Sequence, residues 1–230
     1  MQLDPDGAQH FPAAFTSSEV AALQRHFSNL PQDRPGTRLA PPRDGEGDHA
    51  KHGGGGPSLA RLIAPADAIA ASILGPGSPT VRAVLFDKTP QRNWALGWHQ
   101  DRTIAVRERR DLPGFTDWTV KSGIAHCVPP FDLLARMLTL RIHLDPVAEA
   151  NAPLIIAPGS HSTRWPEPEI PAAVARYGTH SCLAEAGDVW AYSTPILHAS
   201  DRARVPDRRR VLQLLYSAEN LPGGLEWLGI

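Results

Sequence analysis

The stretch ARMLTLRIHLD, residues 135 to 145, alternates between apolar and polar side chains. The apolar set is Leu138, Leu140, Ile142 and Leu144, and the polar set is Thr139, Arg141 and His143. Because residues i and i+2 of a β-strand project from the same face, this pattern predicts a strand with one apolar face. The polar face is directed either to solvent or to a cavity, and in a cavity Arg141 requires an anion.

Further short apolar segments, separated by turn residues, lie on both sides of this strand. Strands are predicted over residues 80–88, 95–106, 152–161, 187–194 and 209–218. Helices are predicted over 16–27, where Thr16 and Glu19 fit a capping box, over 58–75, with an interruption at Pro65, and over 169–177. The 23 prolines and 19 glycines favour many turns and short strands. The sequence therefore predicts one domain, residues 1–230, mainly β with flanking helices, arranged as a barrel or sandwich around a cavity.

Charge and composition exclude several classes of protein. The formal net charge of −1 gives no global field for nucleic acid or an anionic membrane. No apolar run reaches the roughly 18 residues of a membrane span, and the N-terminus has no signal-peptide pattern. Cys127 and Cys182 are expected to be reduced and buried. A cytoplasmic protein acting on a small molecule is the expectation.

The tract from residue 31 to 57 is rich in proline, glycine and charge. It is too polar to pack by itself and too irregular to form a regular element, which is typical of a mobile loop or a lid over a cavity. Its four glycines, residues 53–56, are followed by neither Lys-Ser nor Lys-Thr, so they do not form a phosphate-binding loop.

A histidine and an aspartate, His99 and Asp101, stand two residues apart in the segment ALGWHQDRTIAV, residues 95–106. If this segment is a strand, both point to one face, as a hydrogen-bonded pair or as part of a metal site. His198, after another β-rich run, completes a 2-His-1-carboxylate triad of the kind that binds non-haem Fe(II). Arg209 follows eleven residues later and suits the distal end of a dicarboxylate. Strand alternation directs Arg209 opposite to its two neighbours, Arg208 and Arg210, which we expect to be solvated.

Four segments together resemble the phytanoyl-CoA dioxygenase family of Fe(II)- and 2-oxoglutarate-dependent oxygenases: WHQD (98–101), NAPLIIAPGSH (151–161), GDVWAYSTPILHAS (187–200) and RRVLQLLYSA (209–218). The resemblance extends from about residue 80 to the C-terminus. It implies a double-stranded β-helix, a jelly-roll or cupin-like barrel, in which His99, Asp101 and His198 bind Fe(II). It also implies that Arg209 and Ser200 bind 2-oxoglutarate and that O2 is consumed. Arg141 departs from the aromatic residue of some family members, and we assign it to 2-oxoglutarate or to a substrate carboxylate.

The implied reaction is hydroxylation of a C–H bond with release of succinate and CO2. Halogenating relatives need a small residue in place of the carboxylate ligand, so Asp101 favours hydroxylation or desaturation. Two alternatives remain: a non-catalytic β-barrel that binds a small molecule, and a zinc or manganese hydrolase, which leaves Arg209 unexplained.

Three further basic residues are candidates for substrate contact, namely Arg102, Lys121 and His126. The segment 118–130, between predicted strands, is a candidate wall of the cavity. Such residues favour a small, carboxylate-bearing metabolite. The competing interpretations are that Lys121 is solvated and that His126 is simply packed in the core.

Overall fold

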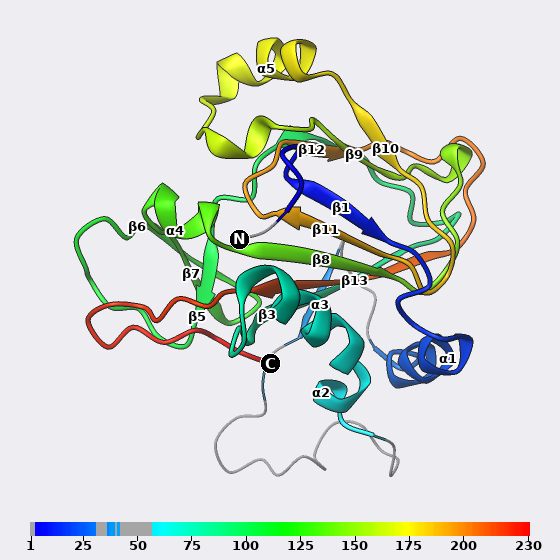
Figure 1. The fold of residues 1–230 in the computed structure, drawn as a ribbon, viewed down its shortest axis with the longest axis horizontal. Coiled ribbons are helices and arrows are strands. Elements are labelled where there is room, and N and C mark those ends of the chain that lie inside the picture. Colours follow the sequence, from blue (N-terminus) through cyan, green and yellow to red (C-terminus); the bar gives the residue numbers. More distant parts are fainter. Residues whose placement is uncertain (1–2, 31–35, 40, 42–56) are drawn as a thin grey trace.

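The computed structural model describes residues 3–30, 36–39, 41 and 57–230, and its largest element is a six-stranded antiparallel sheet (Figure 1). Across the sheet, the order is β1 (Ala8–Phe11), β11 (Val189–Ser193), β8 (Leu138–His143), β13 (Arg209–Tyr216), β3 (Thr80–Lys88) and β2 (Thr37–Leu39). The stretch that opened the sequence analysis is β8, which lies between β11 and β13 in the middle of this sheet.

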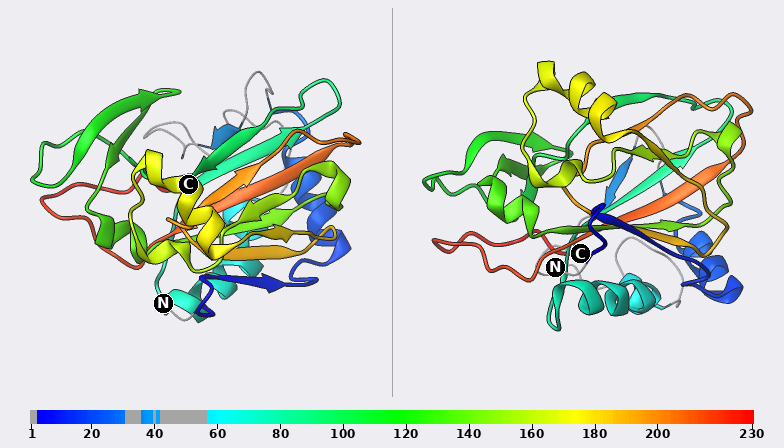
Figure 2. Two further views of the ribbon diagram at one scale, coloured as in Figure 1. Left: turned by 90° about the horizontal axis from the view of Figure 1, so that it is seen from above. Right: turned by 45° about the horizontal axis from the view of Figure 1, so that its top comes forward.

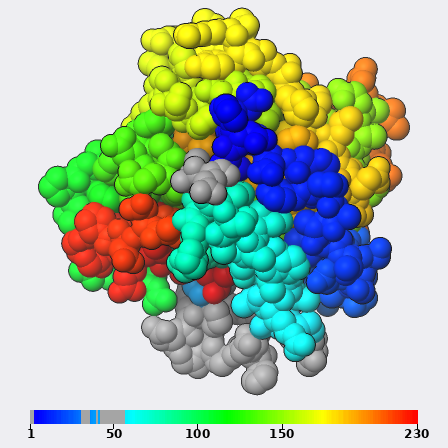
Figure 3. Space-filling model, viewed as in Figure 1, coloured from blue at the N-terminus to red at the C-terminus, as the bar shows by residue number. Residues whose placement is uncertain are grey.

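Three helices cover one face of the six-stranded sheet. They are α1 (Ser17–His26), α2 (Leu59–Leu62) and α3 (Ala64–Leu74), and Figure 3 shows them on the surface in blue and cyan. Leu138, Leu140 and Ile142 of β8 belong to one buried apolar cluster with Leu23 of α1 and Ala70 of α3. The predicted apolar face of β8 therefore packs against helices, and its polar face is turned to the opposite side.

A four-stranded sheet packs on that opposite side. Its strands, in order, are β10 (His180–Cys182), β9 (Leu154–Ile156), β12 (His198–Ser200) and β4 (Leu96–His99). Trp190 and Tyr192 of β11 share a buried apolar cluster with Leu154 and Ile156 of β9, so the two sheets lie face to face. Arg141 of β8 consequently lies in the space between the sheets, where it is buried.

A three-stranded sheet projects at one end of the molecule (Figure 2). It consists of β5 (Ile104–Val106), β7 (Ile124–Val128) and β6 (Thr116–Lys121), and α4 (Phe131–Ala135) packs against it. The remaining elements are α5 (Ile170–Tyr177) and three 3-10 turns, η1 (Glu149–Asn151), η2 (Ser160–Ser162) and η3 (Glu167–Glu169). Segment 118–130 was expected between strands, but it contains most of the β6–β7 hairpin.

The predicted fold class is confirmed: the chain is mainly β with flanking helices. The capping box at Thr16 and Glu19 is present at the start of α1. Two segment boundaries were wrong. Residues 95–106 form two strands, β4 and β5, in different sheets, and the strand of segment 152–161 is limited to Leu154–Ile156. The predicted interruption of the helical segment 58–75 is confirmed, but the two helices meet at Ile63, and Pro65 lies in the first turn of the second helix.

The tract 31–57 was expected to contain no regular element, and this is wrong for Thr37–Leu39. These residues form β2, which pairs with β3 at the edge of the large sheet. The predicted lid falls mostly on residues 31–35, 40 and 42–56, which lie outside the described residues. Cys127 and Cys182 are buried free thiols, as predicted. Over the part of the chain that the structure describes, no helix has the length and apolarity needed to cross a membrane.

Candidate metal and co-substrate site

His99, Asp101 and His198 meet at the four-stranded sheet. His99 is the last residue of β4 and His198 is the first of β12, and the two residues are directly paired across these antiparallel strands. One ligand atom from each of the three side chains lies within 4.8 Å of the other two. The three residues predicted to form a triad therefore come together with the donor set of a divalent metal site.

Asp101 reaches the triad by a route that strand alternation did not predict. Strand β4 ends at His99, so Asp101 lies in the turn before β5. Gln100 holds this turn in place, because its amide nitrogen donates to the carbonyl oxygens of Thr163 (2.8 Å) and Pro195 (2.6 Å). Its amide oxygen accepts a hydrogen bond from the Trp165 backbone at 2.9 Å. The carboxylate is thus positioned by a buried glutamine between the two residues of the His-x-Asp motif.

Each imidazole of the triad is oriented by a backbone carbonyl two residues earlier. His99 Nδ1 is 2.8 Å from the oxygen of Gly97, and His198 Nδ1 is 2.9 Å from that of Ile196. A carbonyl oxygen only accepts hydrogen bonds, so Nδ1 carries the proton in both rings. Nε2 then has a free lone pair for a metal. In metal sites, the other ring nitrogen of a ligating histidine normally donates a hydrogen bond in this way and so fixes the tautomer.

The charges of the triad also suit a metal. Burial lowers the pKa of His198 to about 4, although Asp101 opposes this effect. Burial works against ionisation of Asp101, but the positive charges of His198, Arg82 and His99 outweigh it and hold the pKa of Asp101 below its ordinary value. A neutral imidazole and an ionised carboxylate are the protonation states that ligate a cation.

Arg209, the first residue of β13, is buried beside the triad-bearing strand β12. Its Nη1 donates to the carbonyl oxygen of Ala152, and its Nη2 donates to Ser200 Oγ at 3.4 Å. Its Nε is buried and has no hydrogen-bond partner among the described residues. Burial, reinforced by Arg141, lowers the pKa of Arg209 to about 9.

Lys88, at the end of β3, is a second buried cation at the same place, and it pairs directly with Arg209 across the sheet. Its Nζ donates to Ser200 Oγ (3.1 Å) and to the carbonyl oxygen of Asp201 (2.9 Å). Burial, followed by the charges of Arg209 and Arg141, lowers its pKa to about 7. The Ser200 hydroxyl thus accepts from both cations, while it donates to Ala152 at 3.3 Å.

The sequence left open whether the polar face of β8 meets solvent or a cavity. Arg141 lies in the interior, so this face meets the space between the sheets. Its Nη1 donates to Gln213 Oε1 at 2.8 Å, and its guanidinium carbon is 5.2 Å from the Phe86 ring centroid. Its Nε is buried without a partner in the described part of the chain.

Arg141, Lys88 and Arg209 therefore form a cluster of three buried cations. Among the described residues, none of the three forms an ion pair with a carboxylate. Buried charges without counter-ions are costly, and a bound dianion relieves that cost.

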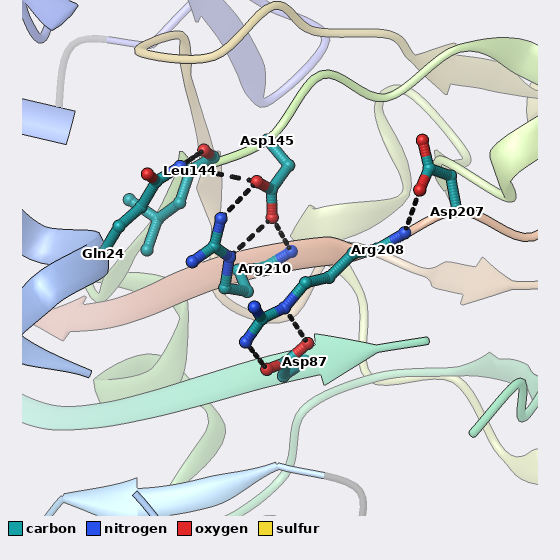
Figure 4. Close-up of polar contacts among 7 residues, drawn as sticks. All are labelled: Gln24, Asp87, Leu144, Asp145, Asp207, Arg208 and Arg210. Atoms are coloured by element: carbon teal, nitrogen blue, oxygen red, sulfur yellow. Dashed lines mark hydrogen bonds and ion pairs between the residues drawn. The ribbon is translucent and has the colours of Figure 1, made fainter. Parts of the chain in front are cut away.

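The neighbours of Arg209 in sequence point to the other side of the sheet, but they are not simply solvated (Figure 4). Arg208 Nη2 is 2.9 Å from a carboxylate oxygen of Asp87. Arg210 Nη2 is 2.6 Å from a carboxylate oxygen of Asp145, and both side chains of this pair are only 14% exposed. The expectation of a solvated Arg210 is therefore wrong, because Asp145 and Gln24 cover it.

The three predicted substrate residues lie in different surroundings. Arg102 donates to the carbonyl oxygen of Trp165 at 2.7 Å and pairs with Glu167 at 3.7 Å. Lys121 is exposed at the end of β6, and His126 is fully buried on β7.

Lys88 was missed at the sequence level. Its spacing in the sequence was the available indication. Lys88 stands two residues after Phe86 and four after Val84, so the three side chains share one face of β3. Ala83 and Leu85, on the opposite face, belong to the helix-covered core.

Several solved structures have the same fold, and some of them hold a metal ion or 2-oxoglutarate. The apo form of EctD from S. alaskensis has a TM-score of 0.65 and 22% identity, covering 98% of this chain and 80% of that chain. HygX from Streptomyces hygroscopicus, solved with nickel and 2-oxoglutarate bound, has a TM-score of 0.59 and 18% identity, covering 93% and 83%. EctD has also been solved with bound iron, with a TM-score of 0.63 and 22% identity, covering 94% and 74%.

Comparison at the sequence level gives the family. No curated protein matches the chain significantly. The family model described as phytanoyl-CoA dioxygenase (PhyH) matches residues 3–211, which is most of the chain. The chain therefore belongs to the phytanoyl-CoA dioxygenase family, a family of Fe(II)- and 2-oxoglutarate-dependent oxygenases with the double-stranded β-helix fold.

Proposed function

We propose that this protein is a single-domain dioxygenase, residues 1–230, that hydroxylates a C–H bond of a small metabolite and converts 2-oxoglutarate and O2 to succinate and CO2. The observation that carries the proposal is the cluster of three buried cations beside the His-Asp-His triad, Lys88, Arg141 and Arg209, which form no ion pair with any carboxylate that the structure describes. A hydrolase that used the same three metal ligands has no need of such a cluster. Family membership and the iron and 2-oxoglutarate bound by EctD and HygX support the proposal.

The triad fits Fe(II), because it supplies one ionised carboxylate and two imidazoles whose Nδ1 atoms are engaged by backbone carbonyls. Three protein ligands leave coordination positions for 2-oxoglutarate and O2, and bound Fe(II) supplies the O2 activation that side chains lack. The carbonyl oxygens of Gly97 and Ile196 keep the imidazoles from turning, and Gln100 fixes the carboxylate. These contacts pre-organise the site before the co-substrate arrives.

The cation cluster fits a dicarboxylate. Arg209 offers its unpartnered Nε, together with Nη2, to the distal carboxylate, and Lys88 adds a second positive charge from the adjacent strand. Ser200 holds both cations through one hydroxyl, which fixes their separation. Arg141 lies one strand further, on the other side of β13, and its unpartnered Nε is available to the same ligand or to the substrate.

Anaerobic addition of Fe(II) and 2-oxoglutarate to the purified protein tests the proposal. We expect a weak visible charge-transfer band that requires both components, and succinate formation once air is admitted. A band without any succinate, across a panel of metabolites, contradicts catalysis and favours the non-catalytic binding protein. Absence of the band, with 2-oxoglutarate shown not to bind, contradicts the site itself.

A further inference from the structure

A second basic site lies at the opposite end of β3 from Lys88. Arg82 is on the same face of β3 as Val84, Phe86 and Lys88, so it projects into the space between the sheets. Its Nε is buried and has no hydrogen-bond partner among the described residues. Burial lowers the pKa of Arg82, and Asp101 is the negative charge that opposes this effect. Arg82 is thus a partly buried cation with a buried Nε, and its charge acts on the metal-binding carboxylate.

His126 of β7 faces the same region. It is fully buried, its Nδ1 is 2.9 Å from the carbonyl oxygen of Ile124, and its Nε2 has no partner in the described part of the chain. Since the carbonyl accepts from Nδ1–H, Nε2 carries a lone pair and acts as an acceptor. Arg82 is close enough to help burial lower the pKa of His126, which falls to about 4. Val81, next to Arg82, and Cys127, next to His126, belong to one buried apolar cluster, so β3 and β7 pack together here. This packing brings an unused donor and an unused acceptor to the same region.

This second site is too far from the first to bind the same 2-oxoglutarate molecule. Arg82 and Lys88 are six residues apart on one strand, which places their backbones about 20 Å apart. Across β13, Lys88 pairs with Arg209, whereas Arg82 pairs with Leu215 at the other end. The two carboxyl carbons of 2-oxoglutarate are only about 5 Å apart. The charges of both Arg82 and Arg141 lower the pKa of Asp101, so both cations act on the same metal-binding carboxylate.

The charge balance of this second site calls for an anion. Asp101 is the negative charge that raises the pKa of Arg82, and it also belongs to the metal-binding triad. A metal on the triad adds two more positive charges and takes up the charge of Asp101. A guanidinium stays protonated even when buried, so Arg82 cannot relieve the cost by losing its proton.

We propose that Arg82 binds a carboxylate of the substrate and that His126 accepts a hydrogen bond from a neighbouring hydroxyl or amino group of the same molecule. The substrate class is then a small hydroxy or amino acid. A single guanidinium matches one carboxylate in a bidentate pair, whereas a phosphate dianion needs further charge. The inference rests on the proposed function, because it takes the triad as the reacting centre beside which Arg82 holds the substrate.

Matched pairs of compounds test the inference. The probes are amino and hydroxy acids, each with its primary amide, added to the protein with Fe(II), 2-oxoglutarate and air. Succinate formation should respond to acids and require at least about 30-fold more of the amide, as expected for losing one side of a buried charge pair. Arg82→Gln should abolish the difference between acid and amide, and Arg82→Lys should restore part of it. Arg109→Gln is the control, because Arg109 is an exposed arginine paired with Asp111.

The result that overturns the inference is a substrate whose amide works as well as the acid, or an acid preference that persists in Arg82→Gln. His126→Phe should remove the preference for hydroxy and amino acids over the unsubstituted acid, and an unchanged preference contradicts its assigned role. If a variant fails to fold, the comparison of acid and amide on the wild-type protein still tests the inference.

A second measurement separates this inference from the proposed function. The midpoint of thermal unfolding is followed with acetate or acetamide added, since a ligand that binds the folded state raises it by mass action. Acetate should stabilise the wild type more than acetamide does, and Arg82→Gln should reduce this difference, leaving only the part that arises from acetate at the Lys88–Arg209 cluster. An acetate–acetamide difference that is the same in the wild type and in Arg82→Gln contradicts an anion site at Arg82. This readout needs no turnover, so it stands even if the protein makes no succinate.

Discussion

Replacing Arg209 with alanine should weaken 2-oxoglutarate binding by about 30- to 1,000-fold. Arg209 is only 3% exposed, so its interaction with a carboxylate is little screened by water. Removing one side of such a pair costs about 2–4 kcal/mol, which gives this range of affinities. Lys88 stays next to the vacated position and holds part of the charge, so we expect the lower half of the range. Arg209→Lys should recover only part of the loss, because an ammonium group cannot form the planar fork.

The assay is an anaerobic titration of the Fe(II)-loaded protein with 2-oxoglutarate, followed by the visible charge-transfer band. Arg208→Ala is the matched control: Arg208 is adjacent in sequence, points to the other face and pairs with Asp87. It should change the affinity by less than about threefold, as a half-exposed ion pair does. A large loss in Arg208→Ala together with normal binding in Arg209→Ala would refute the assignment of the co-substrate anchor.

Three further predictions follow from the same structure. His99→Ala, Asp101→Ala and His198→Ala should each lose most of the Fe(II) affinity while keeping the wild-type circular dichroism spectrum; stoichiometric iron with normal turnover in any one of them removes that residue from the triad. Burial lowers the pKa of Lys88 to about 7, and the amine attracts an anion only when it is protonated, so 2-oxoglutarate affinity should fall as the pH rises from 6 to 8. Lys88→Met should flatten this pH dependence of the affinity, and an identical slope in the variant contradicts the role of Lys88. Arg210→Ala should lower the free energy of unfolding by about 1–3 kcal/mol in urea denaturation, since it leaves the mostly buried Asp145 unpaired, without weakening 2-oxoglutarate binding by more than about threefold.

The central strands were predictable because alternation is a local property of the sequence. Leu138, Leu140 and Ile142 had to face one side whatever their partners were, and the structure places helices there. Whether the polar face of the strand meets solvent or the interior was not predictable from β8 itself. Arg141 lies inside because the four-stranded sheet, contributed by distant parts of the chain, covers that face.

The missed elements are short or carry a weak pattern. Strand β1 has four residues and β10 has three, too few to show a period, and their pairing with β11 and β9 supplies the hydrogen bonds that define them. Strand β6 is almost entirely exposed, so it shows no apolar face. The break between β4 and β5 depends on Gln100, whose partners Thr163 and Pro195 are 63 and 95 residues away.

The candidate site was predictable where a residue pattern carried the chemistry and not where contacts did. His99, Asp101, His198 and Arg209 stand in a recognisable order along the chain. Lys88 belongs to no such pattern, and its proximity to Arg209 arises from the register between β3 and β13. That register involves more than one hundred intervening residues, which no local rule can follow.

The short strand β12 has a consequence for co-substrate selection. It begins with a metal ligand, His198, and ends with Ser200, whose hydroxyl contacts both Arg209 and Lys88. Two residues of extended chain span about 6.6 Å, close to the roughly 5 Å between the carboxyl carbons of a five-carbon oxo diacid. The metal and the distal anchor are therefore separated by a fixed length of backbone that suits one chain length. A 2-oxo diacid that is one carbon shorter should fail to reach the anchor, and one that is one carbon longer should have to bend, so the protein discriminates between homologous diacids through the backbone of a three-residue strand.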